Sequence, residues 1–163
     1  MKKFTKILIV TISVIILGIA YYLISPLFIE KQVNETVADI LQDQAIQEQS
    51  FSMKLLKSGQ WIGVEGHDAQ GQATLLEVNG KNYIRFEDDF TVTNGPDLFV
   101  HLGKDGEYNK NARLGLLKGN IGGQNYEIPE SLNIEDFNEV WVWCRAFSVP
   151  FAVSELQPLE NNN

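Results

Sequence analysis

The sequence contains a single cysteine, Cys144, in 163 residues. One cysteine excludes an internal disulfide, a Cys-x-x-Cys redox pair and a Cys-x-x-Cys-His haem attachment site. The two histidines, His67 and His101, do not have the His-x-His or His-Glu-x-x-His spacing of a metal site. The Gly-x-Ser-x-Gly motif of hydrolases is also missing. These absences give no support to a classical enzyme.

Basic residues are scarce beyond the N-terminus, and the net charge is −8. Lys2, Lys3 and Lys6 precede a long apolar run, whereas all 21 acidic residues lie at or after Glu30. Nucleic-acid binding requires clustered Lys and Arg that neutralise phosphates. The charge pattern therefore argues against nucleic acid as a partner.

Residues 7–29 contain no charged side chain. As a helix they would span about 35 Å, enough for a hydrocarbon core of about 30 Å. We expect one transmembrane helix in the lipid bilayer, with residues 1–6 as a cytoplasmic tail and the C-terminal domain extracytoplasmic, because basic residues stay inside. A signal peptide cleaved after Ala20 is the alternative, but cleavage would leave an apolar new N-terminus. The composition, rich in Asn, Lys and Ile, suits a bacterial plasma membrane.

Residues 30–50 are rich in acids and glutamines, and their apolar side chains recur at helical spacing. The apolar positions are Val33, Val37, Ile40, Leu41 and Ala45. This pattern predicts a short amphipathic helix or stalk that docks on the domain, lies on the membrane or pairs with a second copy. Docking is favoured because the basic polar face of a membrane-surface helix is missing.

Residues 51–158 have the period-two pattern and frequent turns of an antiparallel β domain, followed by a disordered tail at 159–163. Asn79-Gly80 is a strong hairpin signal. The expected strands are 60–65, 72–78, 82–86, 98–102, 113–118, 124–128, 140–144 and 148–153, with a helical turn near 134–137. Short strands without a long helix among them predict a β-sandwich or jelly roll.

A glycine-rich connection, Gly119-Asn120-Ile121-Gly122-Gly123, lies between two of these strands. It lacks the Gly-Lys-Ser/Thr ending and the following helix of a phosphate-binding loop. We therefore interpret it as hairpin glycine.

Cys144 ends the strand Val140-Trp141-Val142-Trp143-Cys144. Strand alternation puts Cys144 on one face with the two valines, and Trp143 and Arg145 on the other. Burial among apolar residues would raise the thiol pKa and suppress the reactive thiolate. Arg145 could stabilise a thiolate only if Cys144 reaches an edge or cleft. The tryptophans are read either as packing or as a stacking platform for a ligand.

A site that combines Cys144 with His67, Asp97 or His101 is geometrically conceivable in a sandwich. His67 follows a strand end, where a turn or surface role is the simpler reading, and His101 lies in strand 98–102 as a half-buried residue. Such a site could hold haem or copper, but the missing motifs disfavour either metal centre.

Four ordered stretches between about residue 57 and residue 156 resemble the DM-thirteen domain family. They are Gly66-His67 with Gly71-Gln72-Ala73; Gly95-Pro96-Asp97-Leu98-Phe99-Val100; Leu117-Lys118-Gly119 with Gly122, Gln124, Tyr126 and Pro129; and Val142-Trp143-Cys144 with Phe147, Val149, Phe151 and Leu156. The last stretch contains the single cysteine that is characteristic of the family. Small departures occur at His101, Ala152 and Ser154.

The resemblance implies a β domain with a cysteine-centred redox or electron-transfer role. It predicts a perturbed, accessible thiol at Cys144 and a separate redox partner protein, since no haem-binding partner domain is encoded in this chain. Two alternatives remain open. One is a non-catalytic ligand-binding or adhesion sandwich with a structural cysteine, and the other is a homodimer linked through Cys144.

Overall fold

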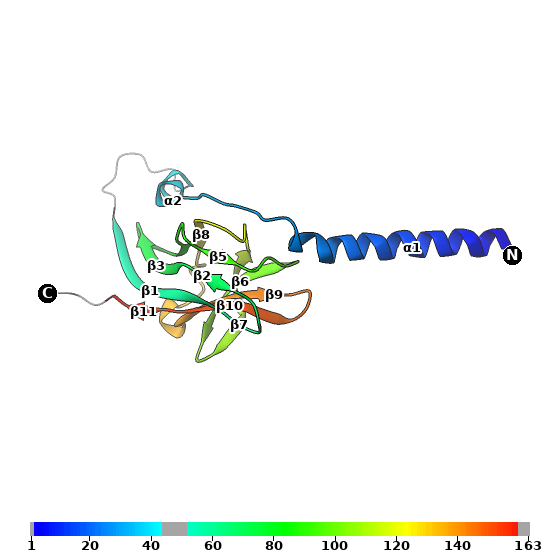
Figure 1. Cartoon of the computed structure of the whole chain (residues 1–163). Coiled ribbons are helices and arrows are strands. Elements are labelled where there is room, and N and C mark those ends of the chain that lie inside the picture. Colours follow the sequence, from blue (N-terminus) through cyan, green and yellow to red (C-terminus); the bar gives the residue numbers. More distant parts are fainter. Residues whose placement is uncertain (1, 44–51, 160–163) are drawn as a thin grey trace.

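The computed structural model describes residues 2–43 and 52–159. Helix α1 (Lys2–Ile24) stands away from the β domain (Figure 1) and is long and apolar enough to cross a membrane. It ends earlier than the apolar run 7–29, and a 3-10 turn, η1 (Ser25–Leu27), follows. Pro26 accounts for this early end, because proline disfavours helical geometry at the preceding residue.

The domain is mainly antiparallel β, as the sequence predicts. Its strands are β1 (Met53–Gly63), β3 (Gln72–Val78), β4 (Lys81–Phe86), β6 (Leu98–Lys104), β7 (Glu107–Leu116), β8 (Gln124–Glu127), β9 (Glu139–Cys144), β10 (Val149–Glu155) and β11 (Gln157–Pro158). A separate pair consists of β2 (Ala69–Gln70) and β5 (Thr91–Val92). The expected helical turn is the 3-10 turn η2 (Ile134–Asp136).

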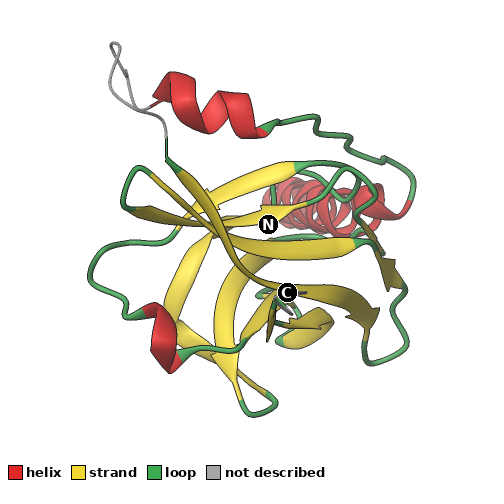
Figure 2. Ribbon diagram, turned by 90° about the vertical axis from the view of Figure 1, so that its left-hand side faces the viewer, coloured by secondary structure: helices red, strands yellow, loops and turns green. Residues whose placement is uncertain are grey.

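One sheet forms both layers of the domain. Its order is β7-β6-β9-β10-β1-β3-β4-β8, with β11 on β1, and it is nearly closed. The view with α1 behind the domain shows the sheet curling round on itself (Figure 2). The antiparallel β class is confirmed, but the two layers belong to one folded sheet and not to two separate sheets.

The hairpin predicted at Asn79-Gly80 joins β3 to β4. Both residues have positive φ, at 50° for Asn79 and 82° for Gly80. Two positive φ values in a two-residue loop give the backbone twist that paired strands require.

The inside of the sheet is filled with apolar side chains. Trp61, Phe86 and Phe90 pack there with ring centroids 4.6 to 5.3 Å apart. Val140, Val142 and Cys144 of β9 belong to the same core and are fully buried. The facing predicted for β9 is therefore confirmed.

Helix α2 (Val37–Asp43) packs on the outside of the sheet through Ile40, which is buried. Ile40 contacts a small cluster formed by Leu76, Val78 and Tyr83. The amphipathic segment thus docks on the domain over its described part. Ala45 lies outside the described residues.

Candidate functional site

Residues 29–36, here called the strap, connect α1 to α2 and are hydrogen-bonded along the domain. The Asn94 side chain donates to Ile29 O at 2.6 Å, and Lys31 N donates to Asn120 Oδ1 at 2.7 Å. Further along, Val33 N donates to Ile121 O at 2.9 Å. The strap is therefore part of the folded domain and does not behave as a free stalk.

The glycine-rich connection accommodates the strap. A Cβ added at Gly119 would lie 2.4 Å from Lys31 O, and one at Gly122 would lie 2.1 Å from Val33 O. The hairpin interpretation of these glycines is wrong, because β7 and β8 are at opposite ends of the sheet order. The glycines allow the strap backbone to approach closely.

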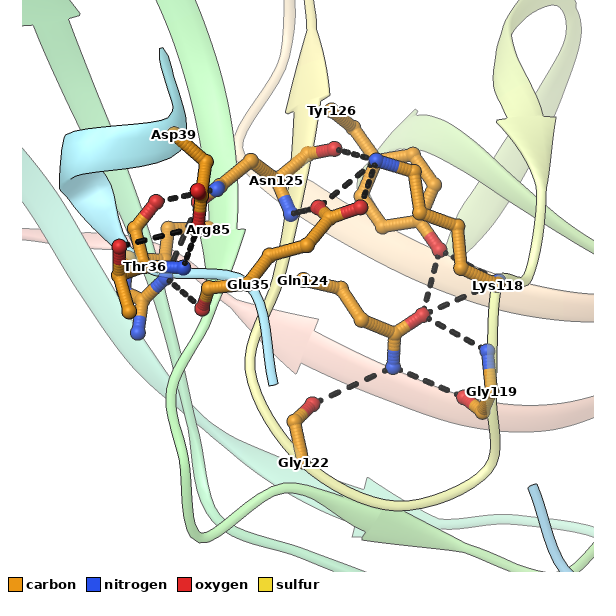
Figure 3. A network of polar contacts seen from close by, with 10 residues as sticks. All are labelled: Glu35, Thr36, Asp39, Arg85, Lys118, Gly119, Gly122, Gln124, Asn125 and Tyr126. Atoms are coloured by element: carbon orange, nitrogen blue, oxygen red, sulfur yellow. Dashed lines mark hydrogen bonds and ion pairs between the residues drawn. The ribbon is translucent and has the colours of Figure 1, made fainter. Parts of the chain in front are cut away.

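A polar network fixes the end of the strap (Figure 3). Lys118 Nζ donates to both carboxylate oxygens of Glu35 at 2.8 Å, and Asn125 N donates to Glu35 Oε2 at 2.9 Å. The buried Arg85 donates through Nη1 to Glu35 O at 2.9 Å and to Asn125 Oδ1 at 3.1 Å. Gln124 completes the network by bonding the backbone of the glycine-rich connection. The contacts of Glu35 join residues that are 50 to 90 positions apart in sequence.

Cys144 lies at the end of β9 with no exposed surface. Its Sγ donates to the carbonyl of Pro96 at 3.1 Å. The redox hypothesis predicted an accessible thiol. This prediction is wrong for the structure, because Cys144 is fully buried. The sulfur nevertheless has polar neighbours and is not sealed among aliphatic groups alone.

A four-residue turn, 145–148, covers Cys144 and connects β9 to β10. Arg145 holds one side of the turn through two hydrogen bonds to the Asp97 carboxylate, at 2.7 and 3.0 Å. Burial raises the pKa of the Cys144 thiol and Asp97 adds to this effect, whereas the backbone N–H groups of Phe147 and Ala146 oppose it. The turn thus shields the sulfur and also offers it hydrogen-bond donors.

The outer face of the same strands has an aromatic and basic pocket of about 200 Å³. The rings of Tyr108 and Trp143 stack with centroids 3.9 Å apart, and His101 meets Tyr108 edge-on. The guanidinium groups of Arg113 and Arg145 lie 5.0 and 4.7 Å from the ring centroid of Phe99. Lys110 also lines the pocket. The basic side chains of this pocket can attract a small anion, and the rings around them offer apolar surface to the rest of such a ligand.

The model of the Electron transfer DM13 family matches residues 62–156. The chain belongs to this family. No curated protein and no solved structure matches it. The match includes Cys144, its turn and the outer pocket, whereas α1 and the strap precede the DM13 domain. Membership suggests an electron-transfer role.

The DM13 domain brings together only some of the residues that the sequence singled out. Arg145 and Asp97 pair at the end of the strand that contains Cys144, whereas Trp143 and His101 both line the outer pocket on the other face of the sheet. His67 instead stacks on Phe151 at 3.6 Å between ring centroids. Within residues 2–43 and 52–159, no cluster of three His, Cys, Asp or Glu side chains could hold a metal ion. Among these described residues, Cys144 therefore does not belong to a His and Cys ligand cluster of the kind that copper sites use.

Tyr108, Arg113 and Phe99 belong to the outer pocket of the DM13 domain but were not predicted. Between the pairs His101↔Arg113 and Gly103↔Tyr108, β7 has four residues where β6 has one. This bulge produces the register that puts Tyr108 on Trp143. Sequence alternation does not reveal a bulge, so no local signal was available.

His101 makes the stability of the DM13 domain pH-dependent. Burial lowers its pKa, with Arg113 acting in the same direction, although Nδ1 contacts Asn109 O at 3.1 Å. The unfolded chain therefore binds a proton at a pH where the folded chain does not, so stability falls as pH drops below about 6.5. We expect His101→Gln to lose less free energy of unfolding than the parent chain between about pH 7.5 and about pH 5.5. Urea denaturation at the two pH values measures this difference. If the parent and the variant lose the same free energy of unfolding, the expectation is wrong.

Proposed function

We propose that this chain is a membrane-anchored electron-transfer protein whose extracytoplasmic DM13 domain uses Cys144 as its redox group. The observation that carries the proposal is the position of the sulfur. It lies directly under the 145–148 turn, which a side-chain ion pair between Arg145 and Asp97 holds in place.

Local opening of the turn is sufficient to expose the thiol. The side chains of Arg145 and Asp97 are 63% and 14% exposed, so the ion pair is open to solvent on the Arg145 side, and solvent screening there keeps its contribution to stability modest, about 1 kcal/mol. Surface turns of this kind open at a much lower free-energy cost than the whole domain unfolds. Cys144 is therefore protected in the closed state and becomes available without global unfolding.

The chemistry needs a disulfide on a second molecule as the electron acceptor, because the chain has no other cysteine. In the open state the Cys144 thiol loses its proton to solvent, and the thiolate attacks one sulfur of a partner disulfide. A mixed disulfide forms, and the second partner sulfur leaves as a thiolate with the electron pair of the broken bond. In the closed state the N–H groups of Ala146 and Phe147 offset part of the rise in thiol pKa that burial causes.

The anchor and its orientation are inferred from the N-terminal segment. Helix α1 has the length and hydropathy of a single membrane span. Lys2, Lys3 and Lys6 at its start favour a cytoplasmic N-terminus, and thus place the domain on the opposite side.

An aromatic disulfide such as Ellman's reagent tests the thiol directly in the full chain in detergent. We expect slow but measurable release of the coloured thiolate from the native protein. Asp97→Asn removes the charged partner of Arg145, so it should accelerate the reaction about threefold to tenfold. The free energy of unfolding should change by less than about 1 kcal/mol.

Asp105→Asn is the matched control, because Asp105 is an exposed acid in the turn between β6 and β7. It should leave the rate unchanged. The opposite result would be that Cys144 reacts with the reagent only as fast as the whole domain unfolds, in the parent chain and in both variants. In that case Cys144 has a purely structural role.

A further inference from the structure

We infer that the end of the domain containing Cys144 rests on the lipid bilayer, with the side chain of Phe147 in the headgroup region. This inference rests on the proposed membrane anchor but not on the redox role of Cys144. Three independent features of the structure support it.

The first feature is the short connection between the anchor and the domain. Helix α1 ends at Ile24, and Ile29 O already accepts a hydrogen bond from Asn94. Asn94 belongs to the segment that leads to Pro96, the acceptor of the Cys144 thiol. The anchor therefore meets the domain at the same end where Cys144 lies, and Figure 1 shows α1 leaving from this end.

The second feature is a shared hollow of about 460 Å³ between the anchor and the domain. Tyr22, Pro26 and Ile29 line one side, and Pro96 and Leu116 line the other. The pKa of Arg145 is raised, chiefly by its hydrogen bond to Asp97. The Tyr22 phenol acts in the same direction, so Tyr22 lies near Arg145. The 145–148 turn is thus adjacent to the last turn of α1.

The third feature is the exposed apolar surface at this end. Phe147 is 53% exposed at the 145–148 turn, and Leu116 is 58% exposed at the end of β7. Phe28, just before the strap, and Ile29, its first residue, are 81% and 56% exposed. Aromatic and apolar side chains at the level where a helix leaves the hydrocarbon partition into the interface. The adjacent anchor identifies lipid as the occupant of this surface.

A fluorescent label on single cysteines measures the predicted depth. The full chain with Cys144→Ala is reconstituted in phosphatidylcholine vesicles, with an environment-sensitive label at Phe147→Cys or, as a second site, Leu116→Cys. The matched control is Lys104→Cys. Lys104 is exposed and is the last residue of β6, whereas the first residue of the same strand, Leu98, lines the hollow. Six strand residues place it about 20 Å farther from the anchor.

Lipids with a quencher near the headgroup should reduce the emission at residues 147 and 116 roughly twofold or more relative to residue 104. Asn94→Ala, which removes the bond to Ile29 O, should diminish this difference. Equal quenching at all three sites in chains that float with the vesicles would overturn the inference and leave the anchor intact. Chains that fail to float would overturn the anchor as well, whereas the thiol assay with Ellman's reagent reports on Cys144 separately.

Discussion

Replacing Arg85 with leucine should lower the free energy of unfolding by about 3 kcal/mol. The Arg85 side chain is 7% exposed and bonds Glu87 at 2.9 Å and Asp88 at 2.7 Å. It also donates to Glu35 O and Asn125 Oδ1, both of which would lose a donor. The carboxylates of Glu87 and Asp88 are 31% and 83% exposed and can be solvated by water, so most of the loss comes from the two acceptors that are left without a donor. Urea denaturation of the full chain in detergent, followed by tryptophan fluorescence, measures the change.

Lys81→Leu is the matched control, because it breaks an ion pair on the same strand. Lys81 and Glu127 are 42% and 48% exposed, so this pair should be worth less than about 1 kcal/mol. A similar loss in both variants would mean that the Arg85 network does not hold the strap more firmly than a surface pair.

Replacing Gly95 with alanine should destabilise the domain by about 2 kcal/mol and accelerate the reaction of Cys144 with thiol reagents. An added Cβ would lie 2.6 Å from Cε2 of Phe151. The Phe151 ring has little room to yield, because His67 stacks on it. Relief of the clash must therefore shift the backbone before Pro96, whose carbonyl accepts from the thiol. Denaturation and thiol labelling on the same sample measure both effects.

Gly18→Ala makes the same chemical change in open surroundings, since an added Cβ there meets nothing within 4 Å. It should leave stability and thiol reactivity unchanged. Parent-like behaviour of Gly95→Ala would show that the Gly95-Pro96 backbone does not determine the protection of Cys144.

Local patterns were sufficient to predict much of the sheet. Strand β3 has the predicted bounds, and Asn79-Gly80 forms the predicted hairpin. Alternation in β9 correctly placed Cys144 inside and Arg145 outside. These features depend on side-chain period and turn chemistry, both of which are encoded within a few residues.

Contacts between distant segments were not predicted. The strap is hydrogen-bonded to residues about 90 positions away in the sequence. The glycines that let the strap backbone approach closely were interpreted as hairpin glycines. The β7 bulge likewise determines which residues meet Trp143. Neither feature leaves a periodic signal, because each depends on a register between separate parts of the chain.

Alternation predicted the inward face of Cys144, but the complete cover over this last residue of β9 could not be derived from its neighbours in sequence. Alternation gives the face of the strand, but the cover over its last residue comes from the 145–148 turn and from Pro96. Pro96 and Asp97 lie in a turn, in which Asp97 has a positive φ of 62°. That this turn contacts the thiol follows only from the pairing of β6 with β9.

The strap also constrains how the proposed membrane anchor would present the domain to a partner. A domain on a loose tether explores a volume that grows with tether length. Residues 29–36 remove that freedom, because they are bonded to the domain almost from the end of α1. In the anchored state the domain therefore moves only as fast as its helix diffuses laterally, and encounter rates should follow the number of molecules per unit area of membrane.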